Sequence, residues 1–168
     1  RRDFTINSIY ADIDGNLFDP NNGVEDLQNG TVRFIGNSYE RIQEDYLRIL
    51  RYIRFFLLYS KKDHSSEIKK TIKQNISGVS NLSKERLLDE LNKIFKSRAL
   101  FKIVKDNFSY EIISLIFPQL INLKILKKLE KKKEEILINK SFDFLLALLI
   151  IDETDNADYF LYKFNLSN

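Results

Sequence analysis

The residues with the clearest chemical potential lie at positions 44–51, which read EDYLRILR. In a helix, Asp45 and Arg48 share a face, so an acceptor would lie beside donors. Cytosine and adenine present the matching pattern, an amino group beside a ring nitrogen. Uracil and guanine present a carbonyl beside an N–H, and bidentate contacts discriminate between bases by roughly 1–3 kcal/mol each. Glu44 would hold Arg48 in place, and Arg51 lies one turn further on. The alternative, which the helix alone favours, is a surface helix with ordinary ion pairs.

A second block of polar residues opens the chain, where positions 1–7 read RRDFTIN. Two arginines beside a predicted strand, Arg1 and Arg2, can clamp a triphosphate through bidentate contacts. Asp3 and Asn7 can accept hydrogen bonds from the hydroxyl groups of a ribose. The alternative interpretation is an arginine-rich strand edge without a ligand.

The two basic residue types are unevenly distributed. Residues 1–60 contain seven arginines and no lysine, whereas residues 61–168 contain eighteen lysines and two arginines. The guanidinium group is planar, bidentate and permanently charged. The arginines of the first third therefore indicate sites that need this geometry, with chance in a short segment as the alternative.

Other candidate residues carry weaker signals. Asp12 and Asp14 point the same way on a strand but run into an Asp-Gly turn, which indicates a polar hairpin edge and not a metal site. His64, the single histidine of the chain, lies in a polar segment and is not expected to be catalytic. The lysine-rich segment Lys124–Lys140 would contact an RNA backbone or form a solvated helix face.

The composition is that of an ordinary globular protein. The chain has 168 residues, 43% of them hydrophobic, with a net charge of +3 and no cysteine. It can bury a real core, and it offers no disulfide or thiolate metal site. No apolar run reaches the roughly 18 residues of a membrane span, so we predict a cytoplasmic protein without membrane contact. No methionine is present, which indicates an internal piece of a longer protein.

The pattern of hydrophobic residues predicts strands first and helices afterwards. A strand over Thr5–Ile13 turns at positions 14–16 and returns at Leu17-Phe18; a short helix at 24–29 and a strand at 32–35 follow. From Ser38, a predicted N-cap, the apolar spacing becomes helical as far as Ser60. Ser83 is a second predicted N-cap. Further helices are predicted at 67–75, 84–96, 98–108, 110–117, 122–137, 141–151 and 155–164.

Several motifs in order resemble those of class II tRNA nucleotidyltransferases (CCA-adding enzymes) and bacterial poly(A) polymerases. They are RRDFTIN at 1–7, a D-P-x-G-G-x-x-D-L loop at 19–27 in which Asn22 replaces the first glycine, VRFIG at 32–36, E-D-x-x-R-x-x-R at 44–51 and S-x-E-R-h-x-x-E-L at 83–91. The resemblance is strong over residues 1–100. It implies a mainly α fold, in which the C-terminal end of an α/β nucleotidyltransferase head (1–37) precedes a helical neck (38–97) and a helical, RNA-binding body (98–168).

The resemblance also implies roles for individual residues. Arg2, supported by Arg1, contacts the nucleotide phosphates, and Asp3 and Asn7 contact the ribose. Asp45 and Arg48 read the incoming base, and Arg51 supports the pocket or the phosphates. The implied nucleotide-binding residues are Arg1, Arg2, Asp3, Asn7, Asp45, Arg48 and Arg51, with Glu44, Arg86 and Glu90 supporting them.

The implied activity is template-independent addition of C or A to tRNA 3′ ends, with ATP, CTP and tRNA as partners and no protein partner. The catalytic Mg²⁺ is expected on a D-x-D motif upstream of Arg1, so no residue of this chain has an implied catalytic or metal role, and we expect the chain alone to be inactive. Two alternatives are open: a bacterial poly(A) polymerase, and a helical RNA-binding module without catalysis.

Overall fold

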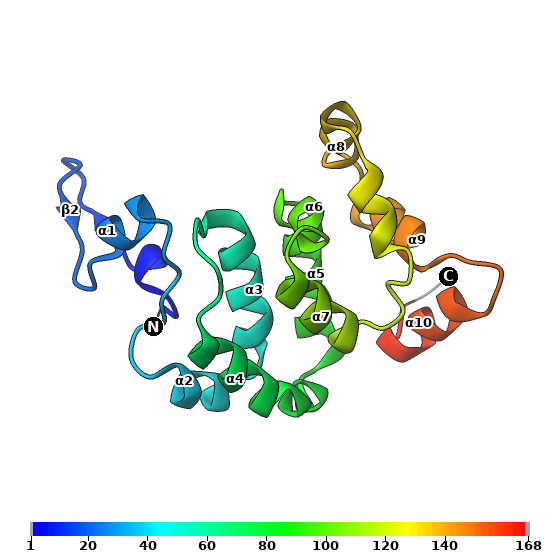
Figure 1. The fold of residues 1–168 in the computed structure, drawn as a ribbon, viewed down its shortest axis with the longest axis horizontal. Coiled ribbons are helices and arrows are strands. Elements are labelled where there is room, and N and C mark those ends of the chain that lie inside the picture. Colours follow the sequence, from blue (N-terminus) through cyan, green and yellow to red (C-terminus); the bar gives the residue numbers. More distant parts are fainter. Residues whose placement is uncertain (1, 167–168) are drawn as a thin grey trace. The chain divides into compact units, whose positions relative to one another are not determined.

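The computed structural model describes residues 2–166. Contacts between Cα atoms divide the chain into two compact units, Arg1–Asn81 and Leu82–Asn168. Among the described residues the regular structure is almost entirely helical, with one two-stranded sheet (Figure 1). The predicted fold class, mainly α, is confirmed. The division after Asn81 coincides with neither predicted boundary, so the three-domain organisation stays a prediction.

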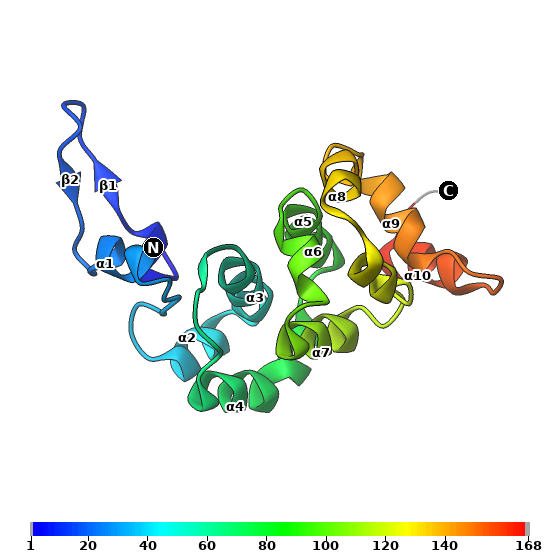
Figure 2. The ribbon, with the colours of Figure 1, turned by 45° about the horizontal axis from the view of Figure 1, so that its top comes forward.

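The first unit begins with a short turn and a hairpin. A 3-10 helix, η1 (Thr5–Asn7), replaces the first half of the predicted strand, because the Asn7 side chain accepts a hydrogen bond from the N–H of Phe4 (3.1 Å) and closes a turn there. The strands β1 (Tyr10–Ala11) and β2 (Leu17–Phe18) then pair antiparallel, as predicted (Figure 2). Gly15 occupies the turn with a positive φ of 84°, which glycine adopts without steric cost.

Asp12 holds this hairpin together. Its carboxylate accepts hydrogen bonds from the backbone N–H groups of Asp14 (2.9 Å) and Asn16 (2.8 Å) and from the Asn16 side chain (2.9 Å). The bonds from Asn16 lower the pKa of Asp12 below its ordinary value. These contacts agree with the hairpin-edge interpretation of Asp12.

A loop and the short helix α1 (Gly23–Gln28) pack against η1. The Asp19 carboxylate accepts from the N–H groups of Gly23 (2.7 Å) and Val24 (2.9 Å), which satisfies donors at the start of α1. Asn22, which stands where the resembling motif has glycine, adopts φ 56°. Because asparagine tolerates the left-handed region better than most residues, the substitution preserves the turn.

The predicted strand at 32–35 is reduced to a single bridge. Phe34 pairs with Phe4 in an isolated antiparallel bridge, and the centroids of their rings lie 4.7 Å apart. The N–H of Ile35 donates to the carbonyl of Asp3 (2.9 Å), and the N–H of Thr5 donates to the carbonyl of Arg33 (3.0 Å). These bonds fix the backbone on both sides of Phe4.

The single helix predicted from Ser38 to Ser60 is wrong: two helices, α2 (Ser38–Glu44) and α3 (Leu47–Tyr59), meet at Asp45. Asp45 has extended backbone angles, and its carboxylate accepts from the N–H of Leu47 (3.2 Å). Aspartate bonds of this local type compete with helix formation. The predicted N-cap is also one residue late, because the side-chain oxygen of Asn37 accepts hydrogen bonds from the backbone N–H groups of Tyr39 and Glu40.

Helix α3 supplies more buried hydrophobic residues to the first unit than any other element. Its residues Ile49, Leu50 and Ile53 are fully buried. The helix α4 (Ser66–Asn75), which Ser65 caps and which begins one residue before the predicted start, and the 3-10 helix η2 (Ile76–Asn81) complete the unit.

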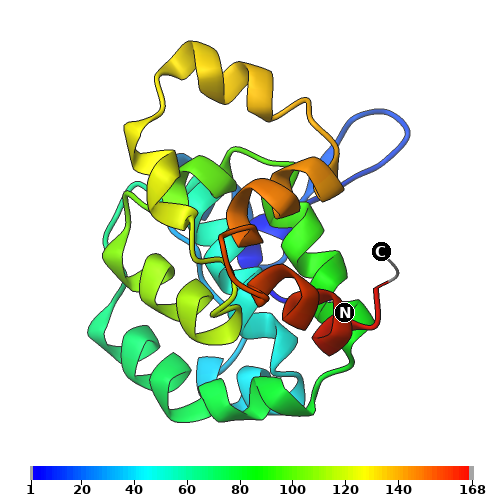
Figure 3. The same cartoon turned by 90° about the vertical axis from the view of Figure 1, so that its right-hand side faces the viewer.

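The second unit contains the remaining helices. Helices α5, α9 and α10 contact one another (Figure 3), and Ser83 caps α5 as predicted. The predicted helix at 98–108 ends early because Asp106 caps the following helix through the N–H of Ser109 (2.7 Å). The predicted helix at 122–137 is interrupted at Leu129 and Glu130, where the backbone is extended. The elements are α5 (Lys84–Phe95), α6 (Ala99–Ile103), α7 (Asn107–Ile116), η3 (Leu123–Lys128), α8 (Lys131–Leu137), α9 (Phe142–Ile150) and α10 (Asn156–Phe164).

Within residues 2–166, none of the helices combines the length and the apolarity that crossing a membrane requires.

Gly23 provides a test of how tightly α1 packs on η1. A Cβ atom at this position would lie 2.1 Å from the carbonyl oxygen of Thr5. Because that oxygen belongs to the backbone, we expect Gly23→Ala to lower the free energy of unfolding by about 1–3 kcal/mol, the usual cost of overpacking. Chemical denaturation of the variant measures this loss. The control is Gly15→Asn, where no atom lies within 4 Å, so its loss should be limited to the strain of a side chain at φ 84°; a loss as large as that of Gly23→Ala would contradict the packing argument.

Candidate functional site

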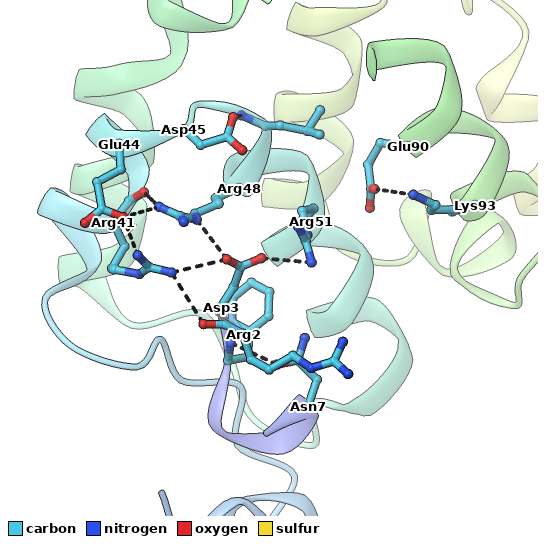
Figure 4. Close-up of polar contacts among 12 residues, drawn as sticks. Arg2, Asp3, Asn7, Arg41, Glu44, Asp45, Arg48, Arg51, Glu90 and Lys93 are labelled. Carbon is cyan, nitrogen blue, oxygen red and sulfur yellow. Dashed lines mark hydrogen bonds and ion pairs between the residues drawn. The ribbon is translucent and has the colours of Figure 1, made fainter. Parts of the chain in front are cut away.

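Asp3 lies at the centre of a group of arginines (Figure 4). Its side chain is 4% exposed, and its Oδ1 lies 3.3 Å from Nη2 of Arg41 and 2.8 Å from Nε of Arg48. Its Oδ2 lies 2.9 Å from Nη2 of Arg51. One buried carboxylate therefore joins three arginines from α2 and α3 to the start of the chain.

Glu44 is the second carboxylate of the group. Its Oε2 accepts from Nη1 of Arg48 at 2.7 Å and from Nη1 of Arg41. Nη1 of Arg48 also donates to the carbonyl oxygen of Arg41, one of the last carbonyls of α2, which has no partner within that helix. We call Asp3, Arg41, Glu44, Arg48 and Arg51 the arginine–carboxylate network.

The network places charge where water is scarce. The Arg41 and Asp3 side chains are each 4% exposed, whereas Glu44 is about half exposed. Burial alone would lower the pKa of Arg48, but hydrogen bonds and attraction from Glu44 and Asp3 outweigh it and hold that pKa above its ordinary value. Buried ion pairs of this kind persist only when the geometry is good and each partner is present.

Two of the predicted relationships can be compared directly with this geometry. The ion pair predicted between Glu44 and Arg48 is present, and Arg51 lies on the same network. The common helix predicted for Asp45 and Arg48 is wrong, because Asp45 ends α2 while Arg48 lies in α3. Both residues nevertheless border the junction of the two helices, so base recognition by the pair stays a prediction.

Two of the predicted nucleotide-binding residues at the start of the chain, Asp3 and Asn7, make contacts within the protein itself. Asp3 is held by the network, and Asn7 closes the η1 turn through the N–H of Phe4. Arg2 is exposed, and its carbonyl oxygen accepts from Nη2 of Arg41 at 3.4 Å. Arg1 lies outside the described residues. The predicted phosphate and ribose contacts stay predictions.

The two predicted supporting residues of α5 lie in the second unit. Glu90 is 1% exposed and lies 3.6 Å from Nζ of Lys93. Arg86 is exposed, and its backbone N–H donates to the hydroxyl of Ser83 at 3.4 Å. Their role beneath a nucleotide pocket stays a prediction.

Arg41 is the residue that the sequence interpretation missed. A signal was present, because Arg41 precedes Glu44 by three residues and belongs to the arginine-rich first third. That signal does not reveal the partner Asp3, which lies 38 residues away in sequence.

His64 lies in the polar loop before α4, as predicted, but its side chain is buried. Its Nδ1 lies 3.0 Å from the hydroxyl of Tyr52, and its ring stacks on Phe56. A cavity of about 440 Å³ lies beside Tyr52 and Phe56, but its lining contains none of the predicted nucleotide-binding residues. Neither feature changes the choice of the network as the candidate site.

The described residues do not offer a metal site. Across positions 2–166, no three side chains of His, Cys, Asp or Glu form a group that would hold a metal ion. Asp12, the tempting metal ligand, is instead occupied by the hairpin. No step of the chemistry is therefore assigned to a metal bound by these residues.

Comparison with known proteins gives this geometry a context. The model of the "Poly A polymerase head domain" matches residues 1–33, and that of the "Probable RNA and SrmB- binding site of polymerase A" matches residues 65–124. The human "CCA tRNA nucleotidyltransferase 1, mitochondrial" is 51% identical over 96 residues, which are 56% of this chain and 22% of that protein. The "CCA-adding enzyme" of Staphylococcus haemolyticus is 32% identical over 160 residues, which are 94% of this chain and 37% of that protein.

Solved structures show the same fold. A "tRNA-processing enzyme (apo form 2)" matches 99% of this chain and 52% of its own, with a TM-score of 0.70 and 24% identity. A Bacillus stearothermophilus CCA-adding enzyme in complex with CTP matches with a TM-score of 0.54 and 22% identity, over 97% of this chain and 49% of its own. The chain belongs to the family of class II tRNA nucleotidyltransferases and poly(A) polymerases. It spans between 22% and 37% of the two curated relatives named above.

The network predicts a large effect of removing the central carboxylate. Asp3→Asn keeps the shape of the side chain but leaves three arginines without their shared counter-charge. We expect the free energy of unfolding to fall by about 3–5 kcal/mol, the usual cost of breaking a buried pair, as measured by denaturant titration. The control is Arg33→Ala, because the Arg33 side chain is 54% exposed in its pair with Asp26, and pairs at the surface contribute at most about 1 kcal/mol. Losses of similar size would show that burial does not govern the network.

Proposed function

We propose that the full-length protein adds C and A to the 3′ ends of tRNA. The observation that carries this proposal is the arginine–carboxylate network, which holds Arg48 beside the Asp45 junction in a chain of the nucleotidyltransferase family. The names of the human and staphylococcal relatives, and the CTP complex of the Bacillus structural neighbour, support the same activity.

The network suggests how Arg48 would read a base. An arginine has five N–H donors, and the contacts within the described residues engage Nε and Nη1 of Arg48. We propose that Nη2 donates to the ring nitrogen of cytosine or adenine, while the Asp45 carboxylate accepts from the exocyclic amino group. Arg2 and Arg1 would contact the phosphates, Asn7 and Asp3 would lie near the ribose, and Arg51 would support the pocket.

Base selection gives a direct test of this arrangement. Asp45→Ala removes the acceptor for the amino group, so selectivity for CTP and ATP over UTP and GTP should fall by one to two orders of magnitude, given roughly 1–3 kcal/mol per contact. Arg48→Ala should lower incorporation of both correct nucleotides, since both use the ring-nitrogen contact. The measurement is single-nucleotide incorporation by the full-length protein, with each of the four NTPs, on tRNA that lacks its 3′ end.

Asp12→Ala is the control for that experiment, because Asp12 serves the hairpin. It should leave base choice and rate nearly unchanged. If Asp45→Ala kept wild-type base selectivity, Glu44, Asp45 and Arg48 would form ordinary ion pairs and would not read the base.

A bacterial poly(A) polymerase is the second candidate, because both matching family models are described by that enzyme. The two candidates differ in the use of CTP. A CCA-adding enzyme extends tRNA that lacks CCA with CTP first, whereas a poly(A) polymerase extends RNA with ATP alone. The same four-nucleotide assay therefore separates them.

The second unit has a surface suited to RNA phosphates. Helix α8 (Lys131–Leu137) buries none of its residues, and its first turn exposes Lys131, Lys132 and Lys133. We propose that this lysine cluster contributes to tRNA binding through non-specific phosphate contacts. The Mg²⁺ of the reaction is proposed to bind outside the described residues. The cytoplasmic location stays a prediction, since the human relative is named mitochondrial.

Replacing the lysine cluster should weaken RNA binding without unfolding the protein. Removing one lysine–phosphate pairing should reduce the slope of log affinity against log salt by about 0.7–0.9, so the triple change to alanine should lower affinity most at low salt. Filter binding of tRNA to the full-length protein at several salt concentrations measures this.

Lys84→Ala is the control, because Lys84 is an exposed lysine of the same unit that donates to the Asn165 side chain at 3.3 Å. If the triple variant kept the wild-type slope of log affinity against log salt, the lysine cluster would be a solvated helix face that does not contact RNA. Salt-dependent binding by a protein that incorporates no nucleotide would favour the non-catalytic RNA-binding module.

A further inference from the structure

We propose that Arg41 is a positioning residue for base selection: it fixes the two carboxylates that orient Arg48, without touching the nucleotide itself. The inference rests on the proposed function, because it gives Arg41 a part in nucleotide choice. The family resemblance assigns roles to several motif residues, and Arg41 is not one of them.

The two arginines share the same acceptor atoms. Oδ1 of Asp3 receives Nη2 of Arg41 and Nε of Arg48, and Oε2 of Glu44 receives Nη1 of both. Each carboxylate oxygen is therefore held from one side by Arg41 and from the other by Arg48. Without Arg41, Oδ1 of Asp3 and Oε2 of Glu44 would each lose one of two arginine donors, although Arg51 would still hold Oδ2 of Asp3. The direction of the remaining N–H groups of Arg48 would then be less firmly fixed.

Arg41 is also well placed to be immobile. It is 3% exposed, and Nη2 makes a further contact with the carbonyl oxygen of Arg2 at 3.4 Å. Glu44, by contrast, has a side chain that is 48% exposed. A half-exposed carboxylate on a helix end has several rotamers available, so the buried guanidinium is the fixed member of the pair.

The geometry requires arginine at this position. Nη1 points to Glu44 while Nη2 points to Asp3 and Arg2, so two arms of the planar fork act at once. Lysine would keep the charge but has a single nitrogen on a flexible stem, and it cannot reproduce a bidentate contact. Arg41→Lys therefore separates the positioning role from the simple presence of a positive charge.

The experiment compares Arg41→Lys with wild type in the full-length protein. Single-nucleotide incorporation on tRNA lacking its 3′ end should show selectivity for CTP and ATP over UTP and GTP reduced by about tenfold, a loss in the range of one weakened base contact. The affinity for tRNA should stay unchanged, because that contact is proposed on the second unit and a general loss of structure would lower both selectivity and affinity. Arg33→Lys, at a side chain that is 54% exposed, should keep both.

The opposite outcomes are equally clear. A folded Arg41→Lys variant with wild-type base selectivity would overturn the inference. Should that variant melt below the assay temperature, the same assay is run below its melting temperature. Reduced base selectivity there would support the inference, and wild-type selectivity would overturn it.

A measurement without catalysis separates this inference from the proposed function. The Nε–H of Arg48 donates to the buried Asp3 at 2.8 Å, so its exchange with water should be slow. NMR with ¹⁵N-labelled arginine should show this exchange to be several-fold faster in Arg41→Lys, with the Arg48 signal assigned from an Arg48→Lys variant. Equal exchange rates would overturn the positioning role even in an active enzyme, and a protein that incorporates no nucleotide at all would overturn only the proposed function.

Discussion

The burial of one carboxylate, Asp3, is the constraint on which the first unit depends. An ionised group removed from water is tolerated only with partners and hydrogen bonds close by. The partners are three arginines that follow Asp3 by 38 to 48 positions, so the start of the chain and the helix pair α2–α3 must meet at fixed distances. The backbone bonds on both sides of Phe4 and the packing of Phe4 on Phe34 hold the same segment in place.

The break between α2 and α3 changes how their arginines are presented to Asp3. In a single straight helix, Arg41, Arg48 and Arg51 would be spaced by seven and three residues along one stripe. The extended backbone of Asp45 interrupts that stripe and lets the two helix segments turn independently. Arg48 then reaches back to the carbonyl of Arg41 at the end of α2, so one side chain bonds both the helix end and the buried carboxylate.

Local contacts could be predicted from the sequence, and long-range ones could not. The pair Glu44–Arg48 follows from helical spacing, and the hairpin at Gly15 follows from turn chemistry; both are present. The interruption at Asp45 could not be predicted, because the apolar spacing continues through Tyr46 into α3. The break depends on the hydrogen bond from the N–H of Leu47 to the Asp45 side chain. The burial of His64 depends on Tyr52 and Phe56 of another element, and no pattern around position 64 contains that information.

The separate use of arginine and lysine along the chain has a physical explanation in these contacts. The arginines of the network are held by fixed acceptors, and a task that compares base edges needs donors with fixed directions. The lysines of α8 are exposed on a helix that buries nothing, and attraction to phosphates needs charge near the surface but no fixed direction. Exchange of the two types would therefore have unequal consequences: arginine on α8 would keep its charge and its reach, whereas lysine in the network would lose the second arm that joins Asp3 to Glu44.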